Sequence, residues 1–256
     1  MRLPLLSLAF LAGCSFLDGL DDYVSNVVCE GIYLGVDDPD LAAQLGLDVS
    51  DGAATTVFLA RATSLSSVEA NLLTDADSVS LRSGGSTVEL ENQGDGTYLA
   101  LGDGGLGYAA GATYVLEVDH DGRSHTASAV APDPPDLGDL PDAGAGELHP
   151  TGQDLTVDLT GQGYDNWLGL VLDADGTVTW DNRPESAGDY IDWIGGSDDV
   201  GVVTIPGSAF PDAGSVYVVG VAGVRRSLDA ELSNFNPIVS NWAVGALAAA
   251  PVGTAP

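Results

Sequence analysis

The sequence lacks lysine altogether, and seven arginines face 38 aspartate and glutamate residues among 256 positions. The formal net charge is therefore −31 at pH 7. Nucleic-acid binding depends on clustered cationic side chains that displace counterions from the phosphate backbone. Because the chain offers no such cationic surface, we do not expect it to bind nucleic acid.

Groups that carry out catalysis are also scarce, with three histidines, two cysteines and no lysine for Schiff-base chemistry. The sequence contains no GxSxG nucleophile motif, no HExxH metal motif and no phosphate-binding GxxxxGK[ST] motif. With so many carboxylates, neighbouring pairs are expected by chance and do not by themselves indicate a glycosidase. We therefore predict a protein that is not an enzyme, and a hydrolase is the weakest alternative.

The first residues have the pattern of a secretory signal peptide. Arg2 is followed by the apolar run Leu3–Ala12, which is too short to span a bilayer. The run ends in Leu11-Ala12-Gly13-Cys14, which resembles the lipobox of bacterial lipoproteins. This resemblance implies that residues 1–13 are removed as a signal peptide and that a diacylglyceryl group is attached to the Cys14 sulfur.

The membrane is then the expected partner, reached through the lipid on Cys14. Ser15 stands where an aspartate would resemble the inner-membrane retention signal of lipoproteins, so the resemblance implies an outer-membrane location in the cell envelope. The alternative is a secreted protein in which Cys14 is retained and forms a disulfide with Cys29. If Cys14 is lipidated, Cys29 is expected to be a small buried apolar residue or an intermolecular thiol.

Residues 14–50 are predicted to form a tether with a short helix, because apolar residues recur there at three- and four-residue steps. These positions are Phe16, Leu17, Leu20, Tyr23, Val24, Val27 and Val28. Alternating β-type patterns indicate two strand-rich domains, at 51–132 and 151–250. Between them, residues 133–150 are rich in Pro, Gly and Asp and are predicted to form a stiff linker, and residues 251–256 a flexible tail.

An internal repeat supports this division. Gly111–Val118 (GATYVLEV) aligns with Gly214–Val221 (GSVYVVGV) at a constant offset of 103 residues, about the length of one immunoglobulin-like domain. In both copies a glycine lies three residues before a tyrosine that opens a hydrophobic strand. This resembles the tyrosine corner of fibronectin type III and other immunoglobulin-like modules, which implies a tyrosine hydroxyl bonded back to nearby backbone. We predict an all-β fold with two tandem immunoglobulin-like β-sandwich domains.

Two segments between strands carry aspartates two positions apart before a glycine, Asp119-His120-Asp121-Gly122 and Asp173-Ala174-Asp175-Gly176. Asp119, Asp121, Asp173 and Asp175 are therefore candidate ligands for calcium, the one cofactor that the sequence suggests. Neither segment continues to the twelfth-position glutamate of an EF-hand loop. A three-residue hairpin loop that ends in glycine is the favoured structure for both.

The hairpin interpretation also predicts which side chains pair across the strands. With His120–Gly122 as the loop, the exposed pairs are Asp119 with Arg123 and Glu117 with His125, and the inward residues are Leu116 and Val118. With Ala174–Gly176 as the loop, the apolar pairs are Leu172 with Val178 and Leu170 with Trp180.

All four tryptophans lie in the second predicted domain, and two of them stand beside carboxylate and amide side chains. Aromatic rings next to such polar groups are typical of carbohydrate-binding surfaces. The candidate ligand-binding residues are Tyr164, Asp165, Asn166, Trp167, Tyr190, Asp192 and Trp193. The favoured alternative is structural, with Trp180 in the core and the tryptophans at 167 and 193 packed at the rim of the sandwich.

Together, these features predict a lipid-anchored cell-envelope protein that acts as a non-enzymatic binding or structural module. The alternatives are a calcium-assisted carbohydrate-binding or adhesion module and, less favoured, a hydrolase. A carbohydrate or another envelope protein is the expected binding partner, and no cofactor is expected unless the acidic turns bind calcium.

Overall fold

The computed structural model describes residues 27–36, 53–61, 72–101, 106–182, 193, 200–227, 232–235 and 240–256. Most of these residues lie in β-strands, so the all-β fold class predicted from the sequence is confirmed. Short 3₁₀ helices occur at Ala143–Ala145 (η2) and Gly207–Ala209 (η3). No helix in these ranges has the length and hydropathy needed to cross a membrane.

The strands are numbered in chain order. They are β1 (Val27–Val36), β2 (Ala53–Arg61), β3 (Ser78–Ser83), β4 (Ser86–Glu89), β5 (Glu91–Asn92), β6 (Thr97–Leu101), β7 (Thr113–His120), β8 (Arg123–Val130), β9 (Leu148–His149), β10 (Leu155–Asp158), β11 (Asn166–Leu172), β12 (Val178–Asp181), β13 (Val202–Ile205), β14 (Val216–Arg226), β15 (Leu232–Ser233) and β16 (Asn241–Thr254).

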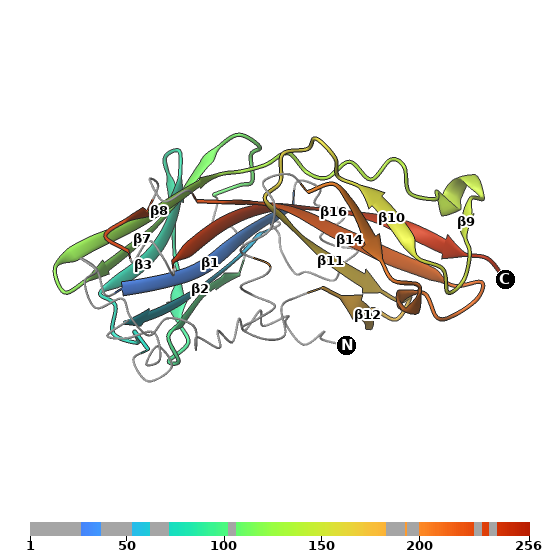
Figure 1. Ribbon diagram of the computed structural model, residues 1–256. Coiled ribbons are helices and arrows are strands. Elements are labelled where there is room, and N and C mark those ends of the chain that lie inside the picture. Colours follow the sequence, from blue (N-terminus) through green and yellow to red (C-terminus); the bar gives the residue numbers. More distant parts are fainter. Residues whose placement is uncertain are drawn as a thin grey trace, which may run out of the picture.

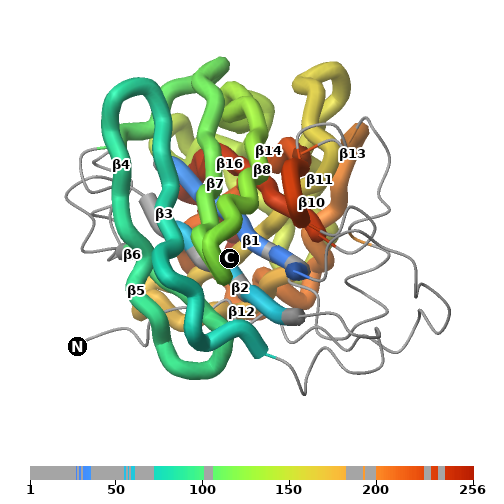
Figure 2. Tube along the Cα trace, turned by 90° about the vertical axis from the view of Figure 1, so that its left-hand side faces the viewer, coloured from blue at the N-terminus to red at the C-terminus, as the bar shows by residue number. Residues whose placement is uncertain are grey.

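A nine-stranded sheet runs through the length of the molecule (Figure 1). Its order is β12-β11-β14-β16-β1-β2-β6-β5, and β9 also pairs with β16. Strands β1 and β16 pair in parallel, with Glu30 opposite Asn241, so the first and last strands of the described residues are neighbours. A five-stranded sheet of order β15-β8-β7-β3-β4 faces one end of it, where Figure 2 shows β4, β3, β7 and β8 next to one another. A two-stranded sheet of β10 and β13 lies at the other end, where Figure 1 shows β10.

The two largest hydrophobic cores of the described residues lie along the nine-stranded sheet. The first combines this sheet with the five-stranded one and contains the fully buried Tyr33, Leu116 and Trp242. The second combines it with β10 and β13 and contains the fully buried Phe210. Strand β16 contributes to both cores, through Trp242 near its start and Val252 near its end. The two ends of the molecule therefore have their own cores but share one sheet.

Both tyrosines of the internal repeat bond back to upstream backbone, as the repeat predicts. The Tyr114 hydroxyl accepts from the Ala109 amide at 2.9 Å and donates to the Gly107 carbonyl at 2.5 Å. The Tyr217 hydroxyl accepts from the Asp212 amide at 2.9 Å, again five residues upstream. Each turn needs a glycine three residues before the tyrosine, because φ is positive there, +76° at Gly111 and +68° at Gly214.

The predicted N-terminal helix is wrong where the structure describes it. Val27 and Val28, the last residues of the helical pattern, lie in strand β1. Hydrogen bonding to β2 on one side and to β16 on the other outweighs the local helical period of the sequence. Phe16, Leu17, Leu20, Tyr23 and Val24 lie outside the described residues, as do the signal peptide and Cys14.

The predicted linker at 133–150 packs against the second core. Leu140 is buried in that core, Leu137 packs against it, and β9 pairs with β16. The predicted flexible tail at 251–256 is wrong as far as Thr254, since β16 continues to that residue. The Thr254 amide donates to the Ser215 carbonyl at 2.8 Å, and its hydroxyl donates to the Asp212 carbonyl at 2.7 Å. These bonds tie the chain end to the turn before β14.

Candidate binding surfaces

Two indole rings meet over a glycine at the edge of the nine-stranded sheet. Trp167 on β11 and Trp180 on the edge strand β12 are half-buried, with ring centroids 6.2 Å apart and planes 29° apart. A Cβ at Gly169 would lie 2.6 Å from the Trp167 ring and 2.8 Å from the Trp180 ring. The rings therefore close over the bare backbone of Gly169, where no larger residue fits. Both pack against the second core, which gives them a structural role.

The side chain of Asn182 fixes this arrangement. Its Oδ1 accepts from the Gly169 amide at 2.6 Å, and its Nδ2 donates to the Trp167 carbonyl at 3.4 Å. The sequence analysis missed both Gly169 and Asn182 as parts of the indole cluster. A glycine within a strand does signal close approach by another group, but it does not say which group approaches.

Three of the predicted ligand-binding residues serve the fold instead. Tyr164 is fully buried, and its hydroxyl donates to the Asp133 carbonyl at 2.9 Å. Burial of the phenol, reinforced by the charge of Asp133, raises the pKa of Tyr164 to about 12. Asp165 accepts from the Arg226 amide through Oδ2 at 2.8 Å, and Asn166 is buried opposite Val224. All three residues therefore take part in contacts within the fold, and a role for them in ligand binding stays a prediction.

Trp193 lies on the face of the sheet opposite to Trp167. It packs against the cluster that contains Leu168 and Ala222, whereas Trp167 packs against the second core. Its indole N–H donates to the Trp167 carbonyl at 3.2 Å. Tyr190 and Asp192 lie outside the described residues. The hydrogen bond therefore brings Trp193 next to the backbone of Trp167, but the two tryptophan rings do not share one surface.

The first acidic turn is a tighter hairpin than predicted. His120 pairs with Arg123, so the loop is the two residues Asp121 and Gly122, with φ of +50° and +71°. Positive φ at both positions is the requirement of a type I′ turn, which Asp-Gly favours and which matches the twist of the strands. The predicted pairs of Asp119 with Arg123 and of Glu117 with His125 are therefore wrong.

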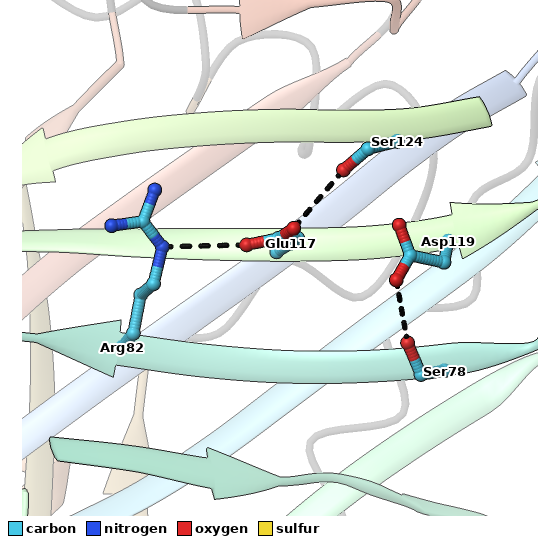
Figure 3. A network of polar contacts seen from close by, with 5 residues as sticks. All are labelled: Ser78, Arg82, Glu117, Asp119 and Ser124. Atoms are coloured by element: carbon cyan, nitrogen blue, oxygen red, sulfur yellow. Dashed lines mark hydrogen bonds and ion pairs between the residues drawn. The ribbon is translucent and has the colours of Figure 1, made fainter.

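The shift by one residue changes which side chains are exposed. His125 lies opposite Val118 and is buried, with 4% of its surface exposed. Leu116 and Val118 point inward, as predicted. On the other face, Glu117 lies 3.3 Å from the Arg82 guanidinium and accepts from the Ser124 hydroxyl at 3.2 Å (Figure 3).

The second acidic turn matches the predicted three-residue loop. The Asp173 amide donates to the Thr177 carbonyl at 2.9 Å, and Leu172 pairs with Val178. A bulge at Val171 and Leu172 places Trp180 opposite Val171, so the predicted pair of Leu170 with Trp180 is wrong. An extra residue in one strand shifts every pair beyond it by one position.

Three of the four aspartates of these turns, Asp119, Asp121 and Asp173, have partners within the chain for their carboxylates. Asp173 accepts from the amides of Asp175 and Thr177 at 2.9 and 2.8 Å. Asp119 accepts from the Ser78 hydroxyl at 3.0 Å (Figure 3), and Asp121 lies 3.1 Å from the His120 imidazole. In the part of the chain that the structure describes, no group of three His, Cys, Asp or Glu side chains is placed to hold a metal ion. Calcium binding at these turns stays a prediction.

The histidines at 120 and 125 are both buried beneath the β7–β8 hairpin, each with 4% of its surface exposed. The His125 Nδ1–H donates to the Asn234 carbonyl at 2.8 Å, and its ring lies 5.3 Å from the ring of Phe235. Burial lowers the pKa of His125 from 6.5, and the neighbouring His120 and Arg123 add to this, whereas the Asn234 bond and Asp119 oppose it. The neutral imidazole thus holds the segment after β15 against β8.

We expect this histidine to make the protein less stable in mild acid. Since the folded-state pKa lies below the unfolded value of about 6.5, the stabilisation is complete above that pH and is lost as the pH falls through the folded-state pKa. Denaturant unfolding measures the free energy of unfolding at about pH 7.5 and pH 5. This free energy should be lower at pH 5 for the natural chain, and the decrease should be smaller for His125→Gln. Equal drops in the two proteins would contradict the assignment.

Comparisons with known proteins add little. No protein-family profile and no curated protein matches the chain. Among solved structures, one similar chain is described as "Biofilm associated protein - BSP domain"; it is 11% identical, with a TM-score of 0.23. The match covers 90% of this chain and 30% of that chain. At this level of similarity we take nothing about function from it.

Proposed function

We propose that this chain is a non-enzymatic binding or structural module of the bacterial cell envelope, anchored to the outer membrane by lipid on Cys14. The observation that carries the proposal is Leu11-Ala12-Gly13-Cys14 directly after the apolar part of a signal sequence. Cys29, which the alternative of a secreted protein pairs with Cys14, is fully buried in the first core.

Lipid on a single residue is enough to hold a folded domain at a membrane. Each buried methylene contributes about 0.8 kcal/mol, so one acyl chain binds reversibly and two or three chains bind firmly. The strand-rich part of the protein is then attached at its N-terminal side and projects into the aqueous phase. Its high negative charge favours solubility and keeps neighbouring copies apart at low salt.

The shared sheet suits a module that holds a binding surface, or another part of the envelope, at a fixed distance. Strand β16 has 14 residues, which at about 3.3 Å per residue spans roughly 46 Å. Because one strand crosses both cores, the two halves do not depend on a flexible joint for their connection. A stiff spacer or a scaffold for binding surfaces fits this construction better than an enzyme whose site closes between mobile domains.

Carbohydrate binding is the second candidate function, favoured by one observation. The stacked rings of Trp167 and Trp180 stay partly exposed at a sheet edge, where a sugar ring could stack on them. The polar residues predicted to assist them are engaged elsewhere, with Tyr164 buried and Asp165 bonded to the Arg226 amide. The structural module is therefore the better supported proposal.

Lipidation can be tested directly in bacterial cells that express the full chain and are fed a labelled fatty acid. We expect the natural chain to incorporate the label and to have a mature mass that begins at residue 14 with acyl groups added. Cys14→Ser should lose the label and keep residues 1–13, and its fraction recovered in washed membranes should fall. Cys29→Ser is the matched control and should behave like the natural chain. A natural chain without label, or a mature N-terminus elsewhere, would refute the proposal.

A further inference from the structure

The chain segment between β14 and β16 crosses from one sheet to the other. Strands β14 and β16 both belong to the nine-stranded sheet, yet β15 between them pairs with β8 at the edge of the five-stranded sheet. Leu232 lies opposite Ala127, and Ser233 lies opposite Thr126. We call residues 232–235 the strap. Because β8 has eight residues and β15 only two, the strap is a short cover for an edge whose backbone groups are able to pair with another strand.

Beyond its two paired residues, the strap is held by Asn234 and Phe235. The Asn234 Nδ2 donates to the Ser124 carbonyl at 2.7 Å, and the Asn234 carbonyl accepts from His125 Nδ1 at 2.8 Å. Phe235 is buried in the first core, and its ring lies 5.3 Å from the His125 ring. Two of these contacts meet at one imidazole, so the state of His125 acts directly on the docked strap.

The surroundings of His125 suit a neutral imidazole better than a charged one. No Asp, Glu or Arg residue is buried in the described part of the chain, so no such group inside the fold neutralises a charge on this ring. The neighbouring His120 differs, because its Nε2 lies 3.1 Å from the Asp121 carboxylate. Of the two buried histidines beneath the hairpin, His125 is therefore the one that loses most by gaining a proton.

The charged groups that act on His125 come from β7 and β8, since the strap itself carries no charge. Burial is the largest effect and disfavours the protonated ring, as do His120 and Arg123, whereas the bond to the Asn234 carbonyl and the charge of Asp119 favour it. The pKa of His125 in the docked form therefore lies below its usual 6.5. Release of the strap returns the ring to water, so the released form binds a proton more tightly than the docked form.

We propose that the strap is released from β8 in mild acid while the two sheets stay folded. Strand β8 remains in place because β7 pairs with it along its whole length. Release uncovers the edge of β8 and the part of the first core that Phe235 fills. An edge of this kind accepts an added strand, so acid makes a pairing site available that is covered at neutral pH. This switch does not depend on lipid at Cys14.

Hydrogen–deuterium exchange of the purified full chain, followed by mass spectrometry of its peptides, tests the release at about pH 7.5 and about pH 5.5. After correction for the effect of pH on intrinsic exchange, we expect peptides from the strap and β8 to exchange several-fold faster at the lower pH. One group with a pKa of about 6.5 in the released form limits this rise to about tenfold. Peptides from β11 and β14 should show no rise.

Three substitutions separate the charge on His125 from the other contacts of the strap. His125→Gln keeps a side-chain N–H for the Asn234 carbonyl but gains no charge, so the rise in acid should disappear. His120→Gln changes a histidine that is buried to the same extent, and the rise should persist. Asn234→Gly removes the bond to the Ser124 carbonyl and tolerates the φ of +64° at this position. It should speed exchange of the strap at both pH values and keep the ratio between them.

The outcome in the natural chain decides first. The proposal is overturned if exchange of the strap does not rise in acid, or if the rise extends equally to β11 and β14, which would mean that the whole fold opens. It is also overturned by a rise that survives His125→Gln or that is lost in His120→Gln. Unchanged exchange of the strap at neutral pH in Asn234→Gly would overturn it as well, and this variant decides even where His125→Gln does not fold.

Discussion

Replacing Trp242 by alanine is expected to lower the free energy of unfolding by about 3–5 kcal/mol. The indole is fully buried in the first core, and its N–H donates to the Tyr114 carbonyl at 3.4 Å. The ring also fills the space above Gly31, where a Cβ would lie 3.0 Å from it. Removal of the ring therefore leaves a cavity between β1, β7 and β16. It also removes the indole N–H that donates to the Tyr114 carbonyl.

The same substitution also tests whether the two cores unfold together. Strand β16 continues from Trp242 to Val252 in the second core, so loss of the first core should remove the neighbour that orders β14 and β11. We expect one denaturant transition at a lower midpoint, with circular dichroism and tryptophan fluorescence changing together.

Trp180→Ala is the matched control for this experiment. Trp180 is half-buried on the four-residue edge strand β12, so its removal should cost less than half as much as removal of Trp242. Equal losses from the two substitutions would contradict the assigned burial. A second transition that stays at the natural midpoint in Trp242→Ala would show that the cores are independent despite the shared strand.

Local features of the fold were predictable from the sequence because they depend on neighbouring residues. The repeated glycine and tyrosine at 111 and 114, and at 214 and 217, predict a turn followed by a strand in both halves. The structure contains both, with the expected hydroxyl bonds. The alternation of apolar residues also predicts that Leu116 and Val118 face inward, since successive side chains of a strand point to opposite faces.

The pairing of β1 with β16 was not predictable in the same way. Glu30 and Asn241 lie opposite each other although more than two hundred residues separate them. Hydrophobic periodicity predicts a strand and its buried face, but it carries no information about which distant strand completes the sheet. Val27 and Val28 also fit a helical pattern, and only the strands on either side of β1 decide against it.

Predicted side-chain pairs and shared surfaces were wrong where one position of register or the face of the sheet decides the outcome. His125 was expected in an exposed pair with Glu117, but a two-residue turn at Asp121 and Gly122 places it opposite the buried Val118. Trp167 and Trp193 each stand beside polar residues in the sequence, yet they pack on opposite faces of the sheet. Polar residues next to a tryptophan in the sequence suggest that its ring could bind a ligand. The pairing register of the strands decides which face of the sheet the ring lies on and whether a ligand could reach it.

Alanine at Gly223 is expected to destabilise the protein, whereas alanine at Gly220 on the same strand is not. A Cβ at Gly223 would lie 2.3 Å from the ring of Tyr164, which is fully buried and bonded to the Asp133 carbonyl. The ring cannot move without disturbing the second core and that bond. Such overpacking costs about 1–3 kcal/mol, which at roughly 2–4 °C per kcal/mol corresponds to a fall in Tm of about 2–12 °C for a chain of this size.

Gly220 lies in the same strand β14 and lacks this obstacle. The nearest atom to a Cβ there is Leu247 Cδ1 at 3.6 Å, which is ordinary van der Waals contact. Alanine also restricts the unfolded chain more than glycine does, so Gly220→Ala should leave Tm unchanged or raise it slightly. Thermal unfolding of both variants and the natural chain measures the contrast. Equal Tm values for the two variants would mean that Tyr164 does not pack over Gly223, and the second core would then need a different arrangement of β11 and β14.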